Sequence, residues 1–165
     1  MNAPVIIGLC GGKWGDAGVG KTTVANTLAK QLGFYPVSLV DPVKEVAKEF
    51  FRWDGKIDPA ARLLLDSVCR VGRRISERYW LDLAVARIPK DGSVKRIVFD
   101  DVWFANEAMW LAGCGGVLFR ITRPGHETPD LPCETVEIAN GGTLSELQRR
   151  AALVIESTLA DRGLS

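Results

Sequence analysis

The residues best suited to chemistry form one segment near the start of the chain, Gly15-Asp16-Ala17-Gly18-Val19-Gly20-Lys21-Thr22. Its spacing is G-x-x-x-x-G-K-[ST], the pattern of the phosphate-binding P-loop. Such a loop turns backbone N–H groups toward one anion and needs residues without a bulky Cβ, which the glycines provide. In this pattern Lys21 reaches the β- and γ-phosphates of a nucleotide, and the Thr22 hydroxyl binds Mg²⁺. We therefore predict that this segment, with Thr23, binds the phosphates of a nucleotide.

The segments on either side of this loop are of the kind that positions it. Pro4 to Cys10 is a mainly apolar run that predicts a buried strand, and Thr23 to Leu32 predicts a helix. The positive N-terminal end of that helix would face the phosphates. A strand, a P-loop and a helix in this order favour nucleotide binding over an ordinary glycine-rich turn.

Acidic residues follow two further predicted strands. Tyr35 to Val40 ends at Asp41, and the strand that starts at Lys95 ends at Asp100 and Asp101. In open α/β sheets ligands bind beyond the carboxyl ends of the strands, so we expect these carboxylates to face the P-loop crevice. The second strand fits a Walker-B element, and one of its two acids should hold Mg²⁺. Asp41 is predicted to orient the acceptor hydroxyl or a substrate sugar; it also fits a helix N-cap, and both roles are compatible.

A row of basic residues occupies the helical region that begins at Asp58-Pro59. Charged residues follow at four-residue steps, with Arg73 beside them: Arg62, Asp66, Arg70, Arg74 and Arg78. Guanidinium groups in such a row can hold a phosphate by paired hydrogen bonds, although long basic side chains also simply solvate a helix. From Ala60 to Arg96 nine Lys or Arg residues face four Asp or Glu residues, which suits an anionic substrate.

An apolar stripe runs along the same helical region and is expected to face the core; its members are Leu64, Val68, Val71, Ile75 and Tyr79. Gly72 lies within the region and costs about 1 kcal/mol relative to Ala. This cost indicates the close approach of a ligand or another backbone, or a break between two helices.

The rest of the chain alternates strands and helices. We expect a helix over 105–112, a strand over 117–121, a strand over 134–138 and a helix over 143–159. Alternation of this kind predicts an α/β fold, with a parallel sheet and helices on both faces. Arg123 to Cys133 reads as a loop, the one place for a short lid, and His126 within it is expected to be a solvated side chain rather than a catalytic base.

Composition indicates an ordinary globular protein, with 47% hydrophobic and 25% charged residues among 165. We predict a single domain over 1–165, a cytoplasmic location without a membrane partner, and reduced thiols at four scattered cysteines.

Three parts of the chain together resemble the phage-type deoxynucleoside monophosphate kinases, a branch of the P-loop nucleoside monophosphate kinases. They are the P-loop; the stretch from Arg62 to Trp80; and Asp101-Val102-Trp103-Phe104-Ala105-Asn106-Glu107-Ala108 with Gly115-Gly116 and Ile121-Thr122-Arg123-Pro124 downstream. The resemblance implies a P-loop kinase fold with a five-stranded parallel sheet. It also implies ATP and Mg²⁺ as cofactors, a deoxynucleoside 5′-phosphate as acceptor, and action in a phage-infected bacterium.

Particular residues have predicted roles in this chemistry. Lys21, Asp41 and Arg120 or Arg123 are the predicted catalytic residues, with the arginines stabilising transition-state charge. The metal would be held by Thr22 with Asp101 or Asp100. The predicted acceptor ligands are Asp41, Arg70, Arg73, Arg74, Arg78, Trp103, Asn106 and Glu107. Members of the family usually carry Arg where this chain has Trp103, and the chain is shorter than typical members; both differences concern the acceptor site rather than the donor site.

Two other functions are compatible with the sequence. One is a kinase that phosphorylates the hydroxymethyl group of a modified pyrimidine, such as 5-hydroxymethyluracil, within phage DNA, where basic and aromatic residues would contact the strand. The other is a nucleotide-binding switch or ATPase that acts through a partner. The chain has no Asn-Lys-x-Asp guanine motif, which argues against a GTPase.

Overall fold

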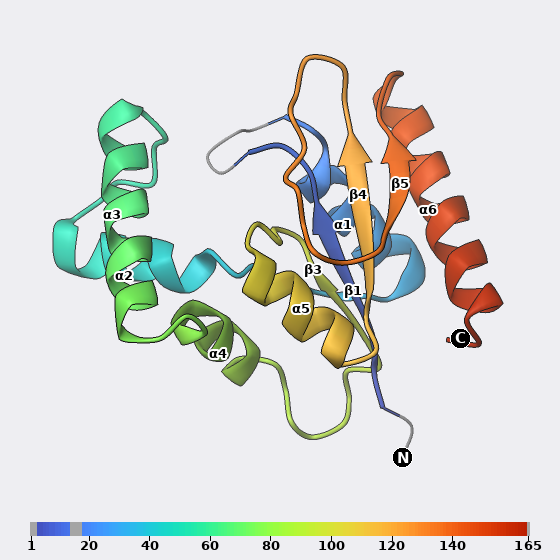
Figure 1. Cartoon of the computed structure of the whole chain (residues 1–165), viewed down its shortest axis with the longest axis horizontal. Helices are drawn as coiled ribbons and strands as arrows, with labels where there is room; N and C mark the ends of the chain where they lie inside the picture. The colour runs from blue at the N-terminus through green and yellow to red at the C-terminus, as the bar shows by residue number, and fades with distance from the viewer. Residues whose placement is uncertain (1–2, 14–17, 165) are drawn as a thin grey trace. The chain divides into compact units, whose positions relative to one another are not determined.

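The computed structural model describes residues 3–13 and 18–164, and the chain forms two compact units, Met1–Val37 with Pro89–Ser165, and Ser38–Ile88. The first, here called the sheet unit, contains β1 (Val5–Cys10), α1 (Lys21–Leu32), β2 (Tyr35–Val37), β3 (Arg96–Phe99), α5 (Ala105–Gly113), β4 (Val117–Thr122), β5 (Thr135–Ala139) and α6 (Leu144–Asp161). The second, the helical unit, contains α2 (Asp41–Phe51), α3 (Pro59–Ile75) and α4 (Tyr79–Ala86) (Figure 1).

The sheet unit is built on a five-stranded sheet of order β2-β3-β1-β4-β5. Every pairing is parallel, so all strands end at the same edge. β1 lies in the middle, with Gly8 opposite Phe99 of β3 on one side and Leu118 of β4 on the other. The predicted five-stranded parallel sheet is confirmed, and the P-loop follows its central strand.

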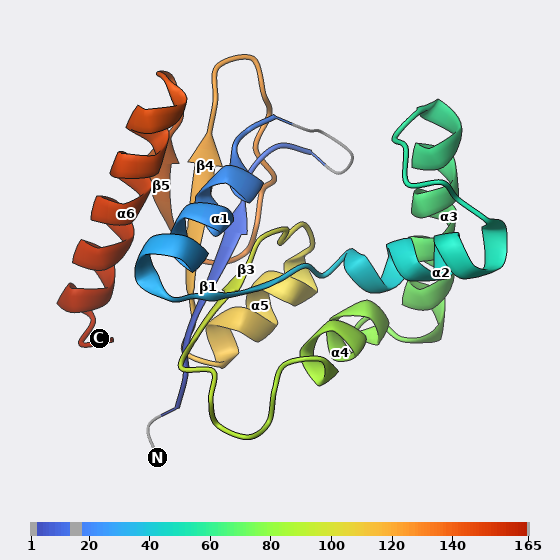
Figure 2. The same cartoon turned by 180° about the vertical axis from the view of Figure 1, so that it is seen from behind.

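Helices cover both faces of this sheet, as predicted. α1 and α6 share one face (Figure 2), where the buried core joins Val24 and Leu28 of α1 to Ala151 and Ile155 of α6 over the strands. α5 covers the other face, and its Leu111 lies so close to β1 that a Cβ on Gly8 would come within 2.5 Å of the leucine Cδ1. The glycine in β1 therefore lets α5 pack directly on the central strand.

The helical unit explains the glycine within α3. The predicted long helical region consists of two helices, because α3 ends at Ile75 and α4 begins at Tyr79. The indole of Trp80 packs flat against Gly72, where an added Cβ would lie 2.4 Å from a ring carbon. The indole N–H also donates a hydrogen bond of 2.8 Å to the carbonyl of Cys69. Close approach of a side chain, rather than of a ligand or backbone, is therefore the reason for this glycine.

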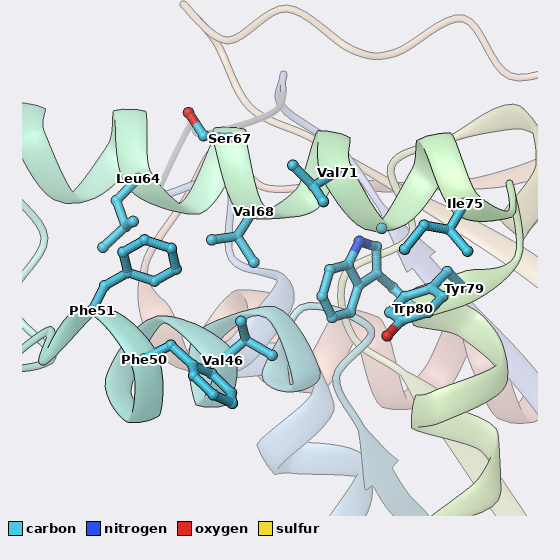
Figure 3. Close-up of a pocket in the computed structure, with 11 residues that line it drawn as sticks. Val46, Phe50, Phe51, Leu64, Ser67, Val68, Val71, Ile75, Tyr79 and Trp80 are labelled. Atoms are coloured by element: carbon cyan, nitrogen blue, oxygen red, sulfur yellow. The ribbon is translucent and has the colours of Figure 1, made fainter.

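The prediction that the apolar stripe of α3 faces a core is wrong for most of its length. Val68 is buried, but Val71 and Ile75 are 64% and 69% exposed. Together with Phe50 and Phe51 of α2 and the aromatic rings of α4, the stripe lines an open apolar hollow of about 360 Å³ within the helical unit (Figure 3). The helices that surround the hollow do not fill it.

We predict that Gly72→Ala destabilises the protein by about 1–3 kcal/mol, because the methyl group forces Trp80 out of its packed position. Urea unfolding followed by tryptophan fluorescence and circular dichroism measures this. Gly113→Ala is the matched control, since it lies in α5 and its added Cβ meets nothing within 4 Å. The control should be neutral or slightly stabilising. Equal midpoints for both variants would contradict the packing explanation.

Candidate functional site

The described part of the P-loop has the backbone that phosphate binding requires. Gly18 and Gly20 adopt φ of 101° and 108°, a region that favours glycine. Gly20 is the N-cap of α1, which has neither a side-chain cap nor an acidic residue in its first turn. The positive end of α1 is thus not neutralised by its own side chains, which suits an anionic ligand. Gly15, Asp16 and Ala17, also predicted ligands, lie outside the described residues.

Lys21 is held between a carbonyl and an aromatic ring. The residue is only 8% exposed, and its Nζ donates a hydrogen bond of 2.6 Å to the carbonyl oxygen of Gly11. The same Nζ lies 4.0 Å from the centroid of the Trp103 ring, a cation–π contact. These contacts place the ammonium group at the carboxyl end of β1, next to the segment that ends β3.

Gly11 is a site residue that the sequence analysis did not single out. Its φ is 141°, and a Cβ there would lie 2.2 Å from the carbonyl oxygen of Ile121 in β4. Only glycine therefore fits at this position, where its carbonyl accepts the hydrogen bond from Lys21. The Gly11-Gly12 pair directly after a predicted strand was the available signal.

Two side chains from the far half of the sheet hold the loop backbone. Asn140, which follows β5, donates a hydrogen bond of 2.8 Å from Nδ2 to the carbonyl of Val19. Arg123, which follows β4, donates a hydrogen bond to the carbonyl of Gly18. The structure therefore brings Arg123, a predicted catalytic residue, to the P-loop, and it adds Asn140, which the sequence analysis did not single out.

Acidic residues lie at the same edge of the sheet as Lys21. β3 pairs in parallel with β1, so Asp100 and Asp101 follow its carboxyl end beside the loop. Asp101 is 8% exposed, and Thr22 is exposed in the first turn of α1. Within residues 3–13 and 18–164 no three His, Cys, Asp or Glu side chains cluster as a metal site. This donor set fits Mg²⁺ only in its nucleotide-bound form, in which phosphates and water supply most ligands.

Glu107 has a structural role in this arrangement. It is 6% exposed, and its Oε2 accepts hydrogen bonds from the backbone N–H groups of Trp103, at 2.9 Å, and Phe104, at 3.0 Å. The carboxylate thereby caps α5 and fixes the backbone that carries Trp103. Asn106 lies in the first turn of α5 and is half-buried. Acceptor binding by Glu107 and Asn106 stays a prediction.

Arg120 and Cys10 lie opposite each other on β4 and β1. The Nε of Arg120 is buried, and no described residue accepts a hydrogen bond from it. Burial raises the pKa of the Cys10 thiol, and the positive charges of Arg120 and Lys21 offset part of that shift. The Cys10 thiol is therefore less acidic than an exposed cysteine.

The helical unit carries the other predicted ligands. Asp41 is the first residue of α2, after the N-cap Val40, and it is exposed with Lys44 at 3.1 Å. On α3 Arg70 pairs with Asp66 at 2.8 Å, and after α3 Arg78 pairs with Asp82 at 2.8 Å. Ser76 is the C-cap of α3, so the predicted row of arginines does not continue along one helix. Arg78 precedes α4 instead.

Among these arginines Arg74 is the most available for an anion. It is exposed on α3, and it makes no ion pair with the residues that the structure describes. Arg73, its neighbour, is half-buried. Acceptor binding by Asp41, Arg70, Arg73, Arg74 and Arg78 stays a prediction.

A central parallel strand, a P-loop and a helix that begins at the loop lysine define the class of protein as a P-loop kinase fold. Similar solved structures carry the same fold. They include a structure titled "putative kinase" from Chloroflexus aurantiacus J-10-fl, with TM-score 0.55, 15% identity, and coverage of 95% of this chain and 98% of that one. A gluconokinase from Sinorhizobium meliloti 1021 gives TM-score 0.51 at 14% identity, with 98% of this chain and 97% of that one covered.

The family is shown by sequence. The chain is 30% identical, over 166 aligned positions, to a protein of Acanthamoeba polyphaga mimivirus named "Putative deoxynucleotide monophosphate kinase", with 81% of this chain and 82% of that protein covered. The chain belongs to the deoxynucleotide monophosphate kinase family, and it is a kinase. No family model matches the chain. In the described residues, no helix is both long and apolar enough to span a membrane.

We predict that Asn140→Ala weakens ATP binding about two- to tenfold, because one hydrogen bond that holds the loop is worth roughly 0.5–1.5 kcal/mol. Titration calorimetry on the folded variant measures the Kd. Asn26→Ala, on the exposed side of α1, is the control and should leave the Kd unchanged. An unchanged Kd in Asn140→Ala would show that the Val19 contact does not shape the binding loop.

Proposed function

We propose that this kinase transfers the γ-phosphate of ATP to a deoxynucleoside monophosphate, with Mg²⁺ as the metal, and that the chain works as one domain over 1–165. The observation that carries the proposal is the P-loop with its buried Lys21 in a chain of the deoxynucleotide monophosphate kinase family. The mimivirus relative bears the name of a deoxynucleotide monophosphate kinase, which supports this acceptor.

Phosphoryl transfer asks the protein for positioning and charge neutralisation rather than covalent chemistry. In this proposal the loop amides and Lys21 bind the β- and γ-phosphates, and Lys21 exchanges its bond to the Gly11 carbonyl for the phosphate oxygens. Arg123, already at the loop, or Arg120 stabilises charge on the transferred group. Bound Mg²⁺ would neutralise phosphate charge, with Thr22 and Asp101 or Asp100 as its protein ligands.

The helical unit supplies the acceptor ligands in this proposal. Asp41 orients the attacking oxygen, and three residues lie between it and Val37 at the end of β2. Arg74, with Arg70, Arg73 and Arg78, binds the acceptor phosphate. A location in the cytoplasm of a phage-infected bacterium fits an acceptor of this kind.

A transfer assay tests the proposal. The protein is incubated with γ-³²P-ATP, Mg²⁺ and each common or hydroxymethylated deoxynucleoside monophosphate, and in parallel with DNA that contains or lacks hydroxymethylpyrimidine. We expect label in a deoxynucleoside diphosphate. Label confined to modified DNA would replace the proposed acceptor, and ATP hydrolysis without an acceptor would favour a switch or ATPase.

Within this assay Lys21→Ala should lower the rate at least about 100-fold while the fold is retained, because a preorganised positive charge at the phosphates is lost. Lys30→Ala, on the exposed side of the same helix, serves as the control and should keep the wild-type rate. A near-wild-type rate for Lys21→Ala would remove the lysine from the mechanism.

Arg74→Ala distinguishes the two acceptors. If Arg74 binds a mononucleotide phosphate, its loss should raise the acceptor KM about tenfold or more, because charge-assisted hydrogen bonds are worth roughly 1.5–3 kcal/mol. If the arginines contact a DNA backbone, the loss should be small, shared among several arginines and dependent on salt. Steady-state kinetics at two salt concentrations separate these outcomes. Arg149→Ala, exposed on α6 in the sheet unit, is the matched control.

A further inference from the structure

We propose that Trp103 is a positioning residue for Lys21: its indole face holds the lysine ammonium group at the P-loop and thereby sets the affinity for ATP. This inference rests on the proposed role of Lys21 as a phosphate ligand. It assigns Trp103 to the donor side of the site, whereas the sequence analysis placed it among the acceptor ligands. The observation behind it is the distance of 4.0 Å between Nζ and the ring centroid.

The contact lies where solvent screening is weak. Lys21 is 8% exposed, and Trp103 is half-buried. A cation over an indole gains more when both are removed from water, and indole gives the strongest contact of the aromatic side chains. The ring therefore stabilises a buried ammonium group that has a backbone carbonyl as its hydrogen-bond acceptor.

The backbone around Trp103 is fixed independently of the lysine. Val102 donates its N–H to the carbonyl of Leu9 in β1 at 3.0 Å. The N–H groups of Trp103 and Phe104 both bind the buried carboxylate of Glu107. Because the segment is fastened to the central strand and to α5, the backbone of Trp103 is held beside Lys21 by contacts that do not involve the lysine.

The position of the indole ring beside Lys21 affects phosphate binding. The ring can supply attraction but no hydrogen-bond acceptor, so it holds the ammonium near the loop while leaving its N–H donors for other groups. The Gly11 carbonyl takes one donor when no nucleotide is bound. When phosphates replace the carbonyl, the contact with the ring persists. Phosphate binding then costs less side-chain conformational entropy at Lys21.

The decisive experiment weakens the aromatic face without changing its shape. Tryptophan, monofluoro- and trifluorotryptophan are placed at position 103 by site-specific incorporation, and the Kd of ATP is measured by calorimetry without any acceptor. We expect the Kd to rise stepwise with fluorination, by about five- to thirtyfold in total. Fluorination of Trp110, whose ring packs edge-on against Phe99, is the control and should not change the Kd.

A second readout needs no nucleotide and so separates this inference from the proposed function. The acetylation rate of Lys21 by acetic anhydride is followed by mass spectrometry, relative to exposed Lys30 on the same helix. Fluorination at 103 weakens the attraction that holds the ammonium group against the ring, so Lys21 should become more accessible to the reagent and react faster. If the rates and the ATP Kd stay constant across the series, the proposal is overturned. A rise in acceptor KM with constant ATP Kd and constant acetylation rate would also overturn it and return Trp103 to the acceptor.

Discussion

The buried charge of Lys21 is the constraint on which the arrangement of the sheet unit depends. An ammonium group at 8% exposure is unfavourable unless the protein compensates for the lost water. Compensation comes from the ends of two adjacent strands, because the Gly11 carbonyl follows β1 and the Trp103 ring follows β3. The parallel pairing of β1 and β3 is thus also what gives the lysine its partners.

The other half of the sheet controls the direction of the loop backbone. In a trans peptide the carbonyl and the N–H point in opposite directions. Arg123 binds the carbonyl of Gly18 and Asn140 that of Val19, so the N–H groups of Val19 and Gly20 are turned away from these side chains. The side chains that follow β4 and β5 therefore act on the amides through the carbonyls, while β1 and β3 hold the lysine.

Local patterns were enough to predict most of the sheet unit from the sequence. The P-loop spacing, the apolar strands and the helix that follows the loop all depend on neighbouring residues, and the predicted parallel sheet was correct. Gly11 and Asn140 were missed because their roles arise from contacts across the fold. Asn140 and Val19 are 121 residues apart in the sequence, and nothing local to Asn140 distinguishes it from an ordinary turn residue.

The helical unit shows a different limit of pattern reading. The amphipathic period of α3 predicted a buried stripe, but a unit of about 50 residues has too little interior to bury every apolar side chain. Gly72 was recognised as unusual, yet the neighbour that requires it, Trp80, lies on the next helix. The hydrophobic periodicity of a helix does not show which neighbouring helix, if any, covers its apolar stripe.

The ion pairs of the arginine row do not prevent it from binding a phosphate. Arg70 and Arg78 each pair with an aspartate four residues away, and their side chains are 77% and 49% exposed. Exposed pairs of this kind contribute little free energy, because water screens both charges. A phosphate dianion offers each guanidinium paired, charge-assisted hydrogen bonds in exchange for a weak contact. In the proposed function, exchanging these ion pairs for a substrate phosphate would therefore cost little free energy.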